Sequence, residues 1–412
     1  MSSKIALKRT RSLAVAALML SFSTGWAADI GQDRLDAIAA DLQSRVDEGR
    51  LAGVVAMVAK DGEVIMNQAF GYRDLENQVE MTTDSIFRIF SMTKPIAGTA
   101  LMTLYDEGKF QLSDPVEKYI PEFANLRVFN SQNADGSIET VAADHAMTIR
   151  ELVSHTGGLA YTPPLSSGPI ADAYVAAHIL DRDVSLKDMI PALGDIPLAT
   201  QPGAQWVYSI SVDVQGYLVE VLSGQSFDEF LQQRIFTPLN MSDTSFYVSA
   251  DKAHRLSRSY GPDATGKIAS PENGAFLEKP AFFSGGGGLT STASDYMKFA
   301  QMHLNGGILD GTRILSNEAI ELMRSNQMPA HIDGIGPIYP GNVFGIDFAV
   351  VNDSEKFDGA SEGSHWWWGI AGTWFWIDPV ENIIFISMIQ NSDLFYSLQT
   401  HAKSRQLIYR PL

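Results

Sequence analysis

Cysteine is absent from the 412 residues of this chain. The absence excludes disulfide bonds, thiolate nucleophiles and cysteine-ligated metals. The sequence also has no Gly-Lys-Ser/Thr phosphate loop, no His-Glu-x-x-His helix and no clustered set of His and Asp side chains. We therefore predict neither a metal site nor a cofactor.

Positive charge is scarce in this chain. Its 30 Lys and Arg residues oppose 48 Asp and Glu residues, which gives a formal net charge of −18 at pH 7. So acidic a surface repels nucleic acids and anionic membranes, and neither is expected as a partner. The charge does not identify a substrate, and the sequence leaves the oligomeric state open.

Apolar runs long enough to span a membrane are also missing. Residues 1–27 combine a basic start, the short apolar run SLAVAALMLSF and the small-residue ending GWA. This order is typical of a secretory signal peptide, whereas a membrane anchor needs about 20 apolar residues. Cleavage after Ala27 would remove four positive charges and no acidic residue, lowering the net charge from −18 to −22. We expect an exported bacterial protein, periplasmic or secreted, without a stable membrane anchor.

Apolar residues make up 45% of the chain, which is enough for a large folded core. Strand-like runs gather at both ends. Residues 51–72 predict a hairpin that turns at Lys60-Asp61-Gly62, and residues 371–390 predict two further strands. Helical patterns lie outside these strands, at 32–50 and 394–407.

The middle of the chain has a different character, with scattered Pro and Gly and helical patterns. We therefore predict an α/β fold of the α+β type. In this fold, residues 28–111 and 281–412 form one domain around a central antiparallel sheet flanked by helices. Residues 112–280 would form a mainly helical insertion domain.

Ser91 lies three residues before Lys94 in the segment FSMTKP, at the start of an apolar helix that should run to about Asp106. Pro95 lacks an N–H and fits the first helical turn, which places the start of the helix close to Ser91. Residues three apart share a helix face, so Lys94 can act as the base for a Ser91 nucleophile. An N-capping serine beside a solvated lysine fits these residues equally well.

Two other serines carry similar motifs in weaker settings. Ser249 also precedes a lysine, Lys252, by three residues, but the segment VSADKAHRLS is polar and typical of a capped surface helix. Ser361 lies in Gly-Ala-Ser-Glu-Gly, yet a nucleophile elbow needs a buried strand before it and a helix after it. A polar loop and an aromatic strand flank Ser361 instead, so neither serine is predicted to be a nucleophile.

The histidines, the glycine run and one tyrosine are further candidates. His155 follows a predicted helix and is expected to cap and pack, whereas His365, beside three tryptophans, is the better site candidate. Four successive glycines at 285–288 are expected to let the backbone pass close to a strand or a cleft. Tyr208, in a loop before a helix, becomes a candidate only if the fold brings it near Ser91.

Taken together, five segments resemble landmarks of the serine β-lactamase-like superfamily, in particular the class C-like esterases called family VIII carboxylesterases. The segments occur in the family's order, and the resemblance covers about residues 35–400. They are SIFRIFSMTKPIAGTALMTLY, TIRELVSHTGGL, YSISVDVQGYLVEVLSG, GGGGLTSTASDYMKFAQ and WWGIAGTWFWIDP. The resemblance implies a β-lactamase/transpeptidase-like fold and a serine hydrolase mechanism.

The resemblance also implies roles for individual residues. Ser91 takes the place of the acyl-accepting nucleophile, and Lys94 that of its proton partner. Tyr208 takes the place of the catalytic tyrosine, which shares the proton with the lysine and passes it to the leaving group. The backbone N–H groups of Ser91 and Ile370 would form the oxyanion hole.

Two departures from the family pattern bear on the substrate. Members that act on β-lactams carry an Asn two residues after the tyrosine, where this chain has Ile210, and a Lys-Thr-Gly strand, where it has Trp367, Trp368 and Gly369. A substrate carboxylate would lose a charge-assisted hydrogen bond there, typically about 1.5–3 kcal/mol. We expect these residues and His365 to line a site for uncharged esters.

The sequence thus predicts a serine carboxylesterase that hydrolyses small esters with short, medium or aromatic groups. A β-lactamase, a D-amino-acid amidase or peptidase, and an acyltransferase of the same fold stay open. A non-catalytic, penicillin-binding-like protein is the alternative outside the enzymes, although the serine, lysine and tyrosine are all retained.

Overall fold

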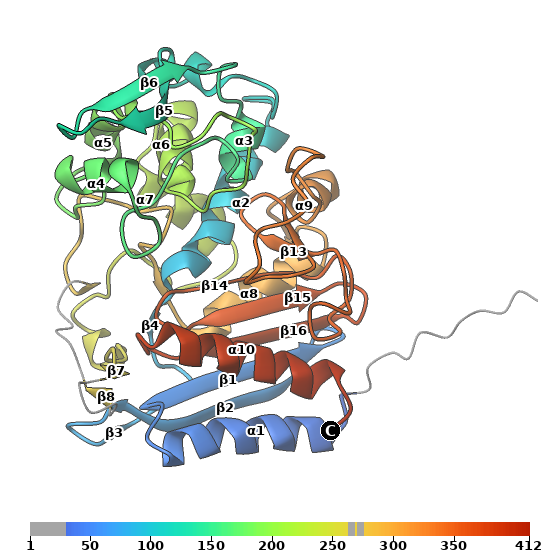
Figure 1. The fold of residues 1–412 in the computed structure, drawn as a ribbon. Coiled ribbons are helices and arrows are strands. Elements are labelled where there is room, and N and C mark those ends of the chain that lie inside the picture. The colour runs from blue at the N-terminus through green and yellow to red at the C-terminus, as the bar shows by residue number, and fades with distance from the viewer. Residues whose placement is uncertain (1–29, 263–267, 270–275) are drawn as a thin grey trace, which may run out of the picture.

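Strands from both ends of the chain form one eight-stranded antiparallel sheet in the computed structural model, which describes residues 30–262, 268–269 and 276–412 (Figure 1). Its strand order is β12-β13-β14-β15-β16-β1-β2-β3. This confirms the predicted fold class, while the predicted signal segment, 1–27, lies outside the described residues. The strands are β1 (Gly53–Lys60), β2 (Glu63–Asp74), β3 (Val79–Glu80), β12 (Asn342–Phe344), β13 (Ala349–Val351), β14 (His365–Trp368), β15 (Trp374–Asp378) and β16 (Ile383–Met388).

The centre of the sheet is the pairing of β1 with β16, which joins the two ends of the chain. β1 is rich in Val and β16 in Ile, and both are almost wholly buried, as strands with both faces covered require. The β1–β2 hairpin turns at Asp61 and Gly62, whose φ angles of 52° and 83° are both positive. An Asp-Gly turn of this kind matches the twist of the flanking strands, so local turn chemistry fixes the hairpin where the sequence predicts it.

Helices cover both faces of the sheet. On one face α1 (Gln32–Asp47) packs beside α10 (Leu394–Tyr409), and α8 (Ala293–Leu304) contacts β1, β15 and β16 from the other (Figure 1). The two terminal helices therefore lie where the sequence predicts them. Two short strand pairs, β4 (Phe87–Arg88) with β9 (Thr290–Ser291) and β10 (Ile308–Leu309) with β11 (Thr312–Arg313), and the helix α9 (Asn317–Met323) lie outside the large sheet.

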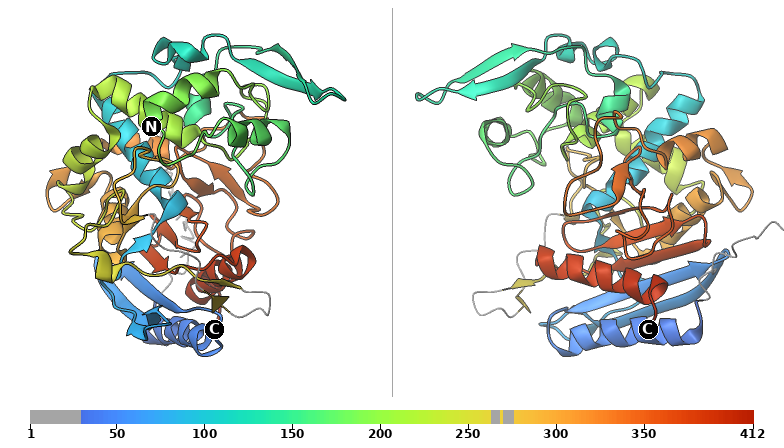
Figure 2. Two further views of the ribbon diagram at one scale, coloured as in Figure 1. Left: turned by 90° about the vertical axis from the view of Figure 1, so that its left-hand side faces the viewer. Right: turned by 45° about the vertical axis from the view of Figure 1, so that its right-hand side comes forward.

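A second region of helices and loops lies above the sheet in Figure 1. The sequence predicts that this region is mainly helical, but it also contains a β-hairpin, which projects from it as Figure 2 shows. The hairpin consists of β5 (Arg127–Gln132) and β6 (Ile138–Ala142), and the helices are α3 (Ile149–Val153), α4 (Pro169–Ala176), α5 (Leu186–Gly194), α6 (Ser211–Ser223) and α7 (Phe227–Leu231), followed by a π-helical turn (Gln232–Phe236).

The helix α2 (Thr93–Asp106) connects the two regions (Figure 1). It packs against α6, and the 3-10 turn that precedes it (Phe90–Met92) contacts β14. Pro95 lies in its first turn, as predicted. Within the described ranges, no helix combines the length and the hydropathy that a bilayer crossing requires.

Candidate active site

Ser91 lies on the 3-10 turn directly before α2, and it is partly exposed. Its neighbour Phe90 has a φ of 42°, in the left-handed region that non-glycine residues rarely adopt. Just before this turn, β4 pairs with β9, and the Ile89 N–H donates to the Leu289 carbonyl at 3.0 Å. Backbone strain held in place by surrounding pairing is typical of functional sites.

Lys94 is fully buried, at 0% exposure, and its Nζ lies 3.2 Å from Ser91 Oγ. The ammonium also donates to the Gly286 carbonyl at 2.7 Å and lies 3.5 Å from Tyr161 Oη. In the part of the chain that the structure describes, no carboxylate lies within ion-pair distance of it. Burying an unpaired charge is costly, so this lysine is a strong candidate for a functional group.

The glycine run brings its backbone to Lys94. A Cβ at Gly285 would clash with the Val212 carbonyl, and one at Gly286 would lie 2.6 Å from Asp213 Oδ2. Only glycine permits this approach, and the element approached is the helix α6 rather than the strand or cleft that the sequence suggested.

Tyr208 faces Lys94 with its ring. The Lys94 Nζ lies 4.6 Å from the ring centroid, a cation–π contact. The Tyr208 hydroxyl accepts a hydrogen bond from Trp367 Nε1 at 3.2 Å, and among the described residues Trp367 is its hydrogen-bond partner. The structure thus places Ser91 Oγ and the Tyr208 ring beside the same Lys94 Nζ, and among the described residues no hydrogen bond joins the Tyr208 hydroxyl to Lys94 or Ser91.

Two further residues close to Lys94 were not singled out from the sequence. Tyr161 stacks on Tyr208, with ring centroids 5.4 Å apart. Asp213 accepts hydrogen bonds from Ser284 Oγ at 2.6 Å and from the Gly286 N–H at 3.0 Å. Burial raises the pKa of Asp213, and the charge of Lys94 opposes that rise. In the sequence, Asp213 is the single carboxylate of the apolar helical segment SVDVQGYLV, and this isolation was the available signal that it is a buried site residue.

A second buried acid, Asp347, lies one helical turn further along α2. Its carboxylate is packed against Gly98, where a Cβ would clash with it. Gln215 Nε2 donates to its Oδ1 at 3.0 Å. Burial raises the pKa of Asp347 to about 8, against the opposing effects of the Gln215 hydrogen bond and the Lys94 charge.

The turn after β14 packs against the chain just before Ser91. A Cβ at Gly369 would clash with the Ile89 carbonyl, and Thr373 Oγ1 donates to the same carbonyl at 3.3 Å. Ile370 follows in this turn and is partly exposed. The backbone of Ile370 is thereby held next to the Ser91 turn, in keeping with the predicted oxyanion hole, whose donor role stays a prediction.

The expected substrate-binding side chains differ in their placement. Trp367 is 2% exposed and faces Tyr208, while Trp368 is 9% exposed and lies near His401. His365 and Ile210 are both 0% exposed. The ring of His365 packs on Phe348, and its Nδ1 lies 3.3 Å from the Gly363 carbonyl. The expectation that His365 and Ile210 line the substrate site is therefore corrected. Both side chains belong to the protein core, because neither is exposed.

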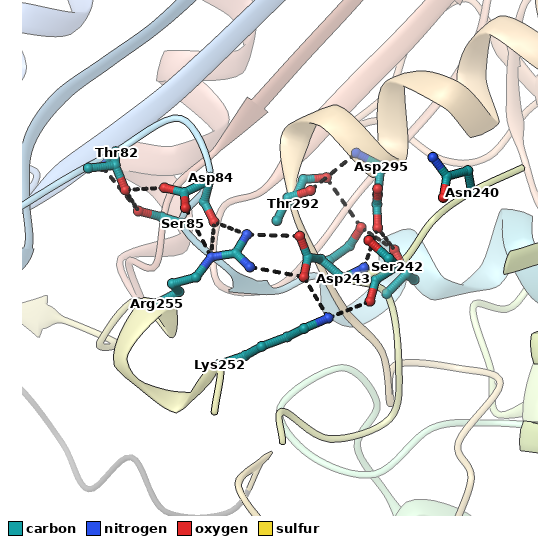
Figure 3. A network of polar contacts seen from close by, with 12 residues as sticks. Thr82, Asp84, Ser85, Asn240, Ser242, Asp243, Lys252, Arg255, Thr292 and Asp295 are labelled. Atoms are coloured by element: carbon teal, nitrogen blue, oxygen red, sulfur yellow. Dashed lines mark hydrogen bonds and ion pairs between the residues drawn. The ribbon is translucent and has the colours of Figure 1, made fainter. Parts of the chain in front are cut away.

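The other two serine motifs have no such surroundings. Lys252 extends to Asp243 Oδ1 at 2.9 Å and to the Ser242 carbonyl at 2.7 Å, in the network drawn in Figure 3. Arg255 pairs with the same Asp243 through two nitrogens, at 3.0 and 2.8 Å. Ser361 donates its N–H to Asp378 at 3.3 Å and precedes β14, a strand rather than the helix that an elbow requires.

The chain is similar in sequence and in fold to several known proteins. The beta-lactamase family model matches residues 38–404. Protein Rv1367c of Mycobacterium tuberculosis is 36% identical over 367 residues, covering 87% of this chain and 90% of that protein. Esterase EstB of Burkholderia gladioli is 30% identical over 361 residues, covering 83% and 86%. The solved structure of EstCE1, a hydrolase with promiscuous acyltransferase activity, has a TM-score of 0.75 at 25% identity and covers 92% of this chain and 99% of its own. The predicted resemblance is confirmed, and the chain belongs to the beta-lactamase family of serine hydrolases.

Proposed function

We propose that this protein is a serine carboxylesterase that hydrolyses small uncharged esters with short, medium or aromatic groups. The observation that carries the proposal is the hydrogen bond from Trp367 Nε1 to the Tyr208 hydroxyl, beside the buried Lys94. Lactam-acting members of the family are expected to carry a lysine where Trp367 stands. An indole there offers no charge to a substrate carboxylate, which favours neutral esters.

Acylation of Ser91 is the first half of the proposed reaction. Ser91 Oγ attacks the ester carbonyl carbon, and its proton passes to whichever member of the Lys94–Tyr208 pair is deprotonated at that moment, a neutral amine or a phenolate. The oxyanion of the tetrahedral intermediate accepts hydrogen bonds from the N–H groups of Ser91 and Ile370. The C–O bond to the alcohol then breaks, the proton moves to the departing oxygen, and the acyl group stays on Ser91.

Deacylation uses the same groups in reverse. Water attacks the acyl-enzyme and gives a proton to the Lys94–Tyr208 pair, which returns it to Ser91 as the carboxylic acid leaves. An indole N–H can only donate, so the Tyr208 oxygen accepts from Trp367 whether or not Tyr208 is protonated, and a protonated Tyr208 can donate its O–H to the departing oxygen. The 3.2 Å separation of Lys94 Nζ and Ser91 Oγ supports direct proton exchange between them.

A direct test compares hydrolysis of p-nitrophenyl butyrate with that of a chromogenic cephalosporin. We expect the ester to be the better substrate by kcat/KM, with activity lost in Ser91→Ala and kept in Ser249→Ala. Faster turnover of the cephalosporin would overturn the ester assignment. A fluorophosphonate that labels wild type and Ser91→Ala equally would instead support a non-catalytic protein.

Acyl transfer is a second candidate, favoured by the description of EstCE1 as a hydrolase with promiscuous acyltransferase activity. Adding methanol to the p-nitrophenyl butyrate reaction separates the two. Butyrate as the main product supports hydrolysis, whereas methyl butyrate in excess of butyrate at low methanol concentration supports acyl transfer as the principal activity.

Export is proposed from the N-terminal segment alone. The basic start, the short apolar run and the small-residue ending of 1–27 support a cleaved signal peptide. N-terminal sequencing of the protein secreted or released from the periplasm is expected to begin at Ala28. Recovery of a full-length chain from the cytoplasm would contradict export.

A further inference from the structure

His155 occupies an unusual backbone position beside the Tyr208 loop. It follows α3 with a φ of 57°, in the left-handed region where histidine is tolerated better than most residues. Its carbonyl accepts a hydrogen bond from the Val207 N–H at 2.9 Å. The residue before Tyr208 is therefore tied to the backbone of His155.

The imidazole of His155 forms hydrogen bonds with Ser209, the residue after Tyr208. It is 1% exposed, and its Nδ1 lies 3.2 Å from the Ser209 N–H, 3.0 Å from Ser209 Oγ and 2.8 Å from Ser211 Oγ. A backbone N–H can only donate, so Nδ1 accepts and the ring is neutral, with its proton on Nε2. Burial and the nearby charge of Lys94 both lower the pKa of His155, which keeps Nδ1 available as an acceptor.

The same imidazole supports the ring of Tyr208. The two ring centroids are 5.1 Å apart, and Tyr161 stacks on Tyr208 at 5.4 Å. His155 thus contacts three consecutive residues, 207–209, through its carbonyl, its ring and its Nδ1. Among the residues that the structure describes, the charged and titratable groups that face it are Lys94, on α2, and Tyr208 itself.

We propose that His155 is a positioning residue that holds Tyr208 over Lys94 through its neutral imidazole. This role rests on the proposed function, in which Tyr208 exchanges a proton with Ser91. His155 does not touch the substrate, because it is buried behind the tyrosine. Its effect is on the orientation of the Tyr208 loop, and displacement of a catalytic group by about 1 Å can cost on the order of 10²-fold in rate.

The experiment compares His155→Phe, which keeps a ring but removes the acceptor, with His155→Asn. Asparagine places an oxygen near the position of Nδ1 and also tolerates a left-handed backbone. We expect His155→Phe to lower kcat for p-nitrophenyl butyrate by about 10- to 100-fold with KM nearly unchanged, and His155→Asn to recover a large part of the loss. His303→Phe is the matched control, since His303 is equally buried but its hydrogen bond is to Thr99 of α2 and not to the Tyr208 loop.

A second readout separates this inference from the ester assignment. The rate at which a fluorophosphonate labels Ser91, per folded molecule counted by circular dichroism, reports on activation of the serine without any ester substrate. We expect slow labelling in His155→Phe, faster labelling in His155→Asn and near wild-type labelling in His303→Phe. If wild type labels rapidly but hydrolyses no ester, the proposed function fails while His155 is still tested. Equal labelling rates in wild type and His155→Phe would overturn the positioning role.

Discussion

Ser91 and Ser249 each precede a lysine by three residues, yet the two lysines are held in opposite ways. Lys94 is fully buried against Ser91, a backbone carbonyl and two tyrosine rings. The Lys252 side chain is 32% exposed and forms an ion pair with a carboxylate at 2.9 Å. The same spacing therefore has no fixed chemical meaning, and the surrounding groups decide what the lysine can do.

The difference lies in which neighbours can exchange a proton. Lys252 is held by Asp243, which also binds Arg255, so its ammonium is committed to a surface charge network (Figure 3). Lys94 is surrounded by hydroxyls, rings and the Gly286 carbonyl, and a hydroxyl can take part in proton transfer. A nucleophile motif needs this second kind of surrounding.

The largest effect is expected from removing the two serines in turn. Ser91→Ala should lower ester hydrolysis by about 10³-fold or more, because the acyl-enzyme cannot form. Ser249→Ala should leave kcat/KM within about twofold, as a surface substitution remote from the site does. Steady-state hydrolysis of p-nitrophenyl butyrate measures both. Comparable losses in the two variants would break the distinction between the motifs.

The two lysines give the next largest effect. Lys94→Met should lower kcat by about 10²- to 10⁴-fold, the range for loss of a general acid–base group. Lys252→Met should change the free energy of unfolding by less than about 1 kcal/mol, because Arg255 still pairs with Asp243. Kinetics and urea denaturation of each variant check this. A Lys252→Met enzyme that is folded but inactive would contradict it.

Trp367→Phe is expected to have a moderate effect, since it removes one hydrogen bond to Tyr208 and keeps an aromatic ring. A net hydrogen bond is worth about 0.5–1.5 kcal/mol, so kcat/KM should fall by up to about tenfold. Trp376→Phe is the matched control, because Trp376 Nε1 donates to the Tyr409 hydroxyl at 2.9 Å elsewhere in the fold. Equal losses of activity in both variants would show that the Trp367 bond is merely structural.

The smallest effect on activity is expected at Asp347, whose replacement acts on folding. Its folded pKa of about 8 lies above the ordinary 3.8, so its contribution to the free energy of unfolding is full below pH 4 and is lost as the pH rises to about 8. Asp347→Asn removes that loss, because an amide does not ionise. Urea denaturation at pH 5 and pH 8 should show the variant gaining stability relative to wild type at the higher pH. A difference that is the same at both pH values would contradict the buried, proton-bound acid.

Local chemistry made part of this structure predictable. The Asp61-Gly62 turn and the alternating runs beside it predict the first hairpin, and Pro95 predicts where α2 begins. The helical spacing of Ser91 and Lys94 predicts their contact at 3.2 Å. These features depend on residues close together in the sequence.

The rest depends on contacts between distant segments. His155 and Asp347 gain their roles only because α3 and the loop before β13 pack near α2 and Tyr208, and nothing in their own segments signals it. The short strands β12 and β13 were also missed, because each has three residues and no clear alternation. The burial of His365 and Ile210 likewise depends on distant packing, because all four residues of β14 are covered and Ile210 lies buried directly before α6.

The burial of α2 has a practical consequence for heat inactivation. Residues Thr93–Leu104 are all buried, and the helix joins the sheet to the helical region (Figure 1). Such a helix cannot open alone, since exposing it would unpack both regions at once. Loss of activity on heating should therefore coincide with calorimetric melting of the whole protein. A simple colorimetric assay after heat challenge would then rank variants by global stability, without any purification for calorimetry.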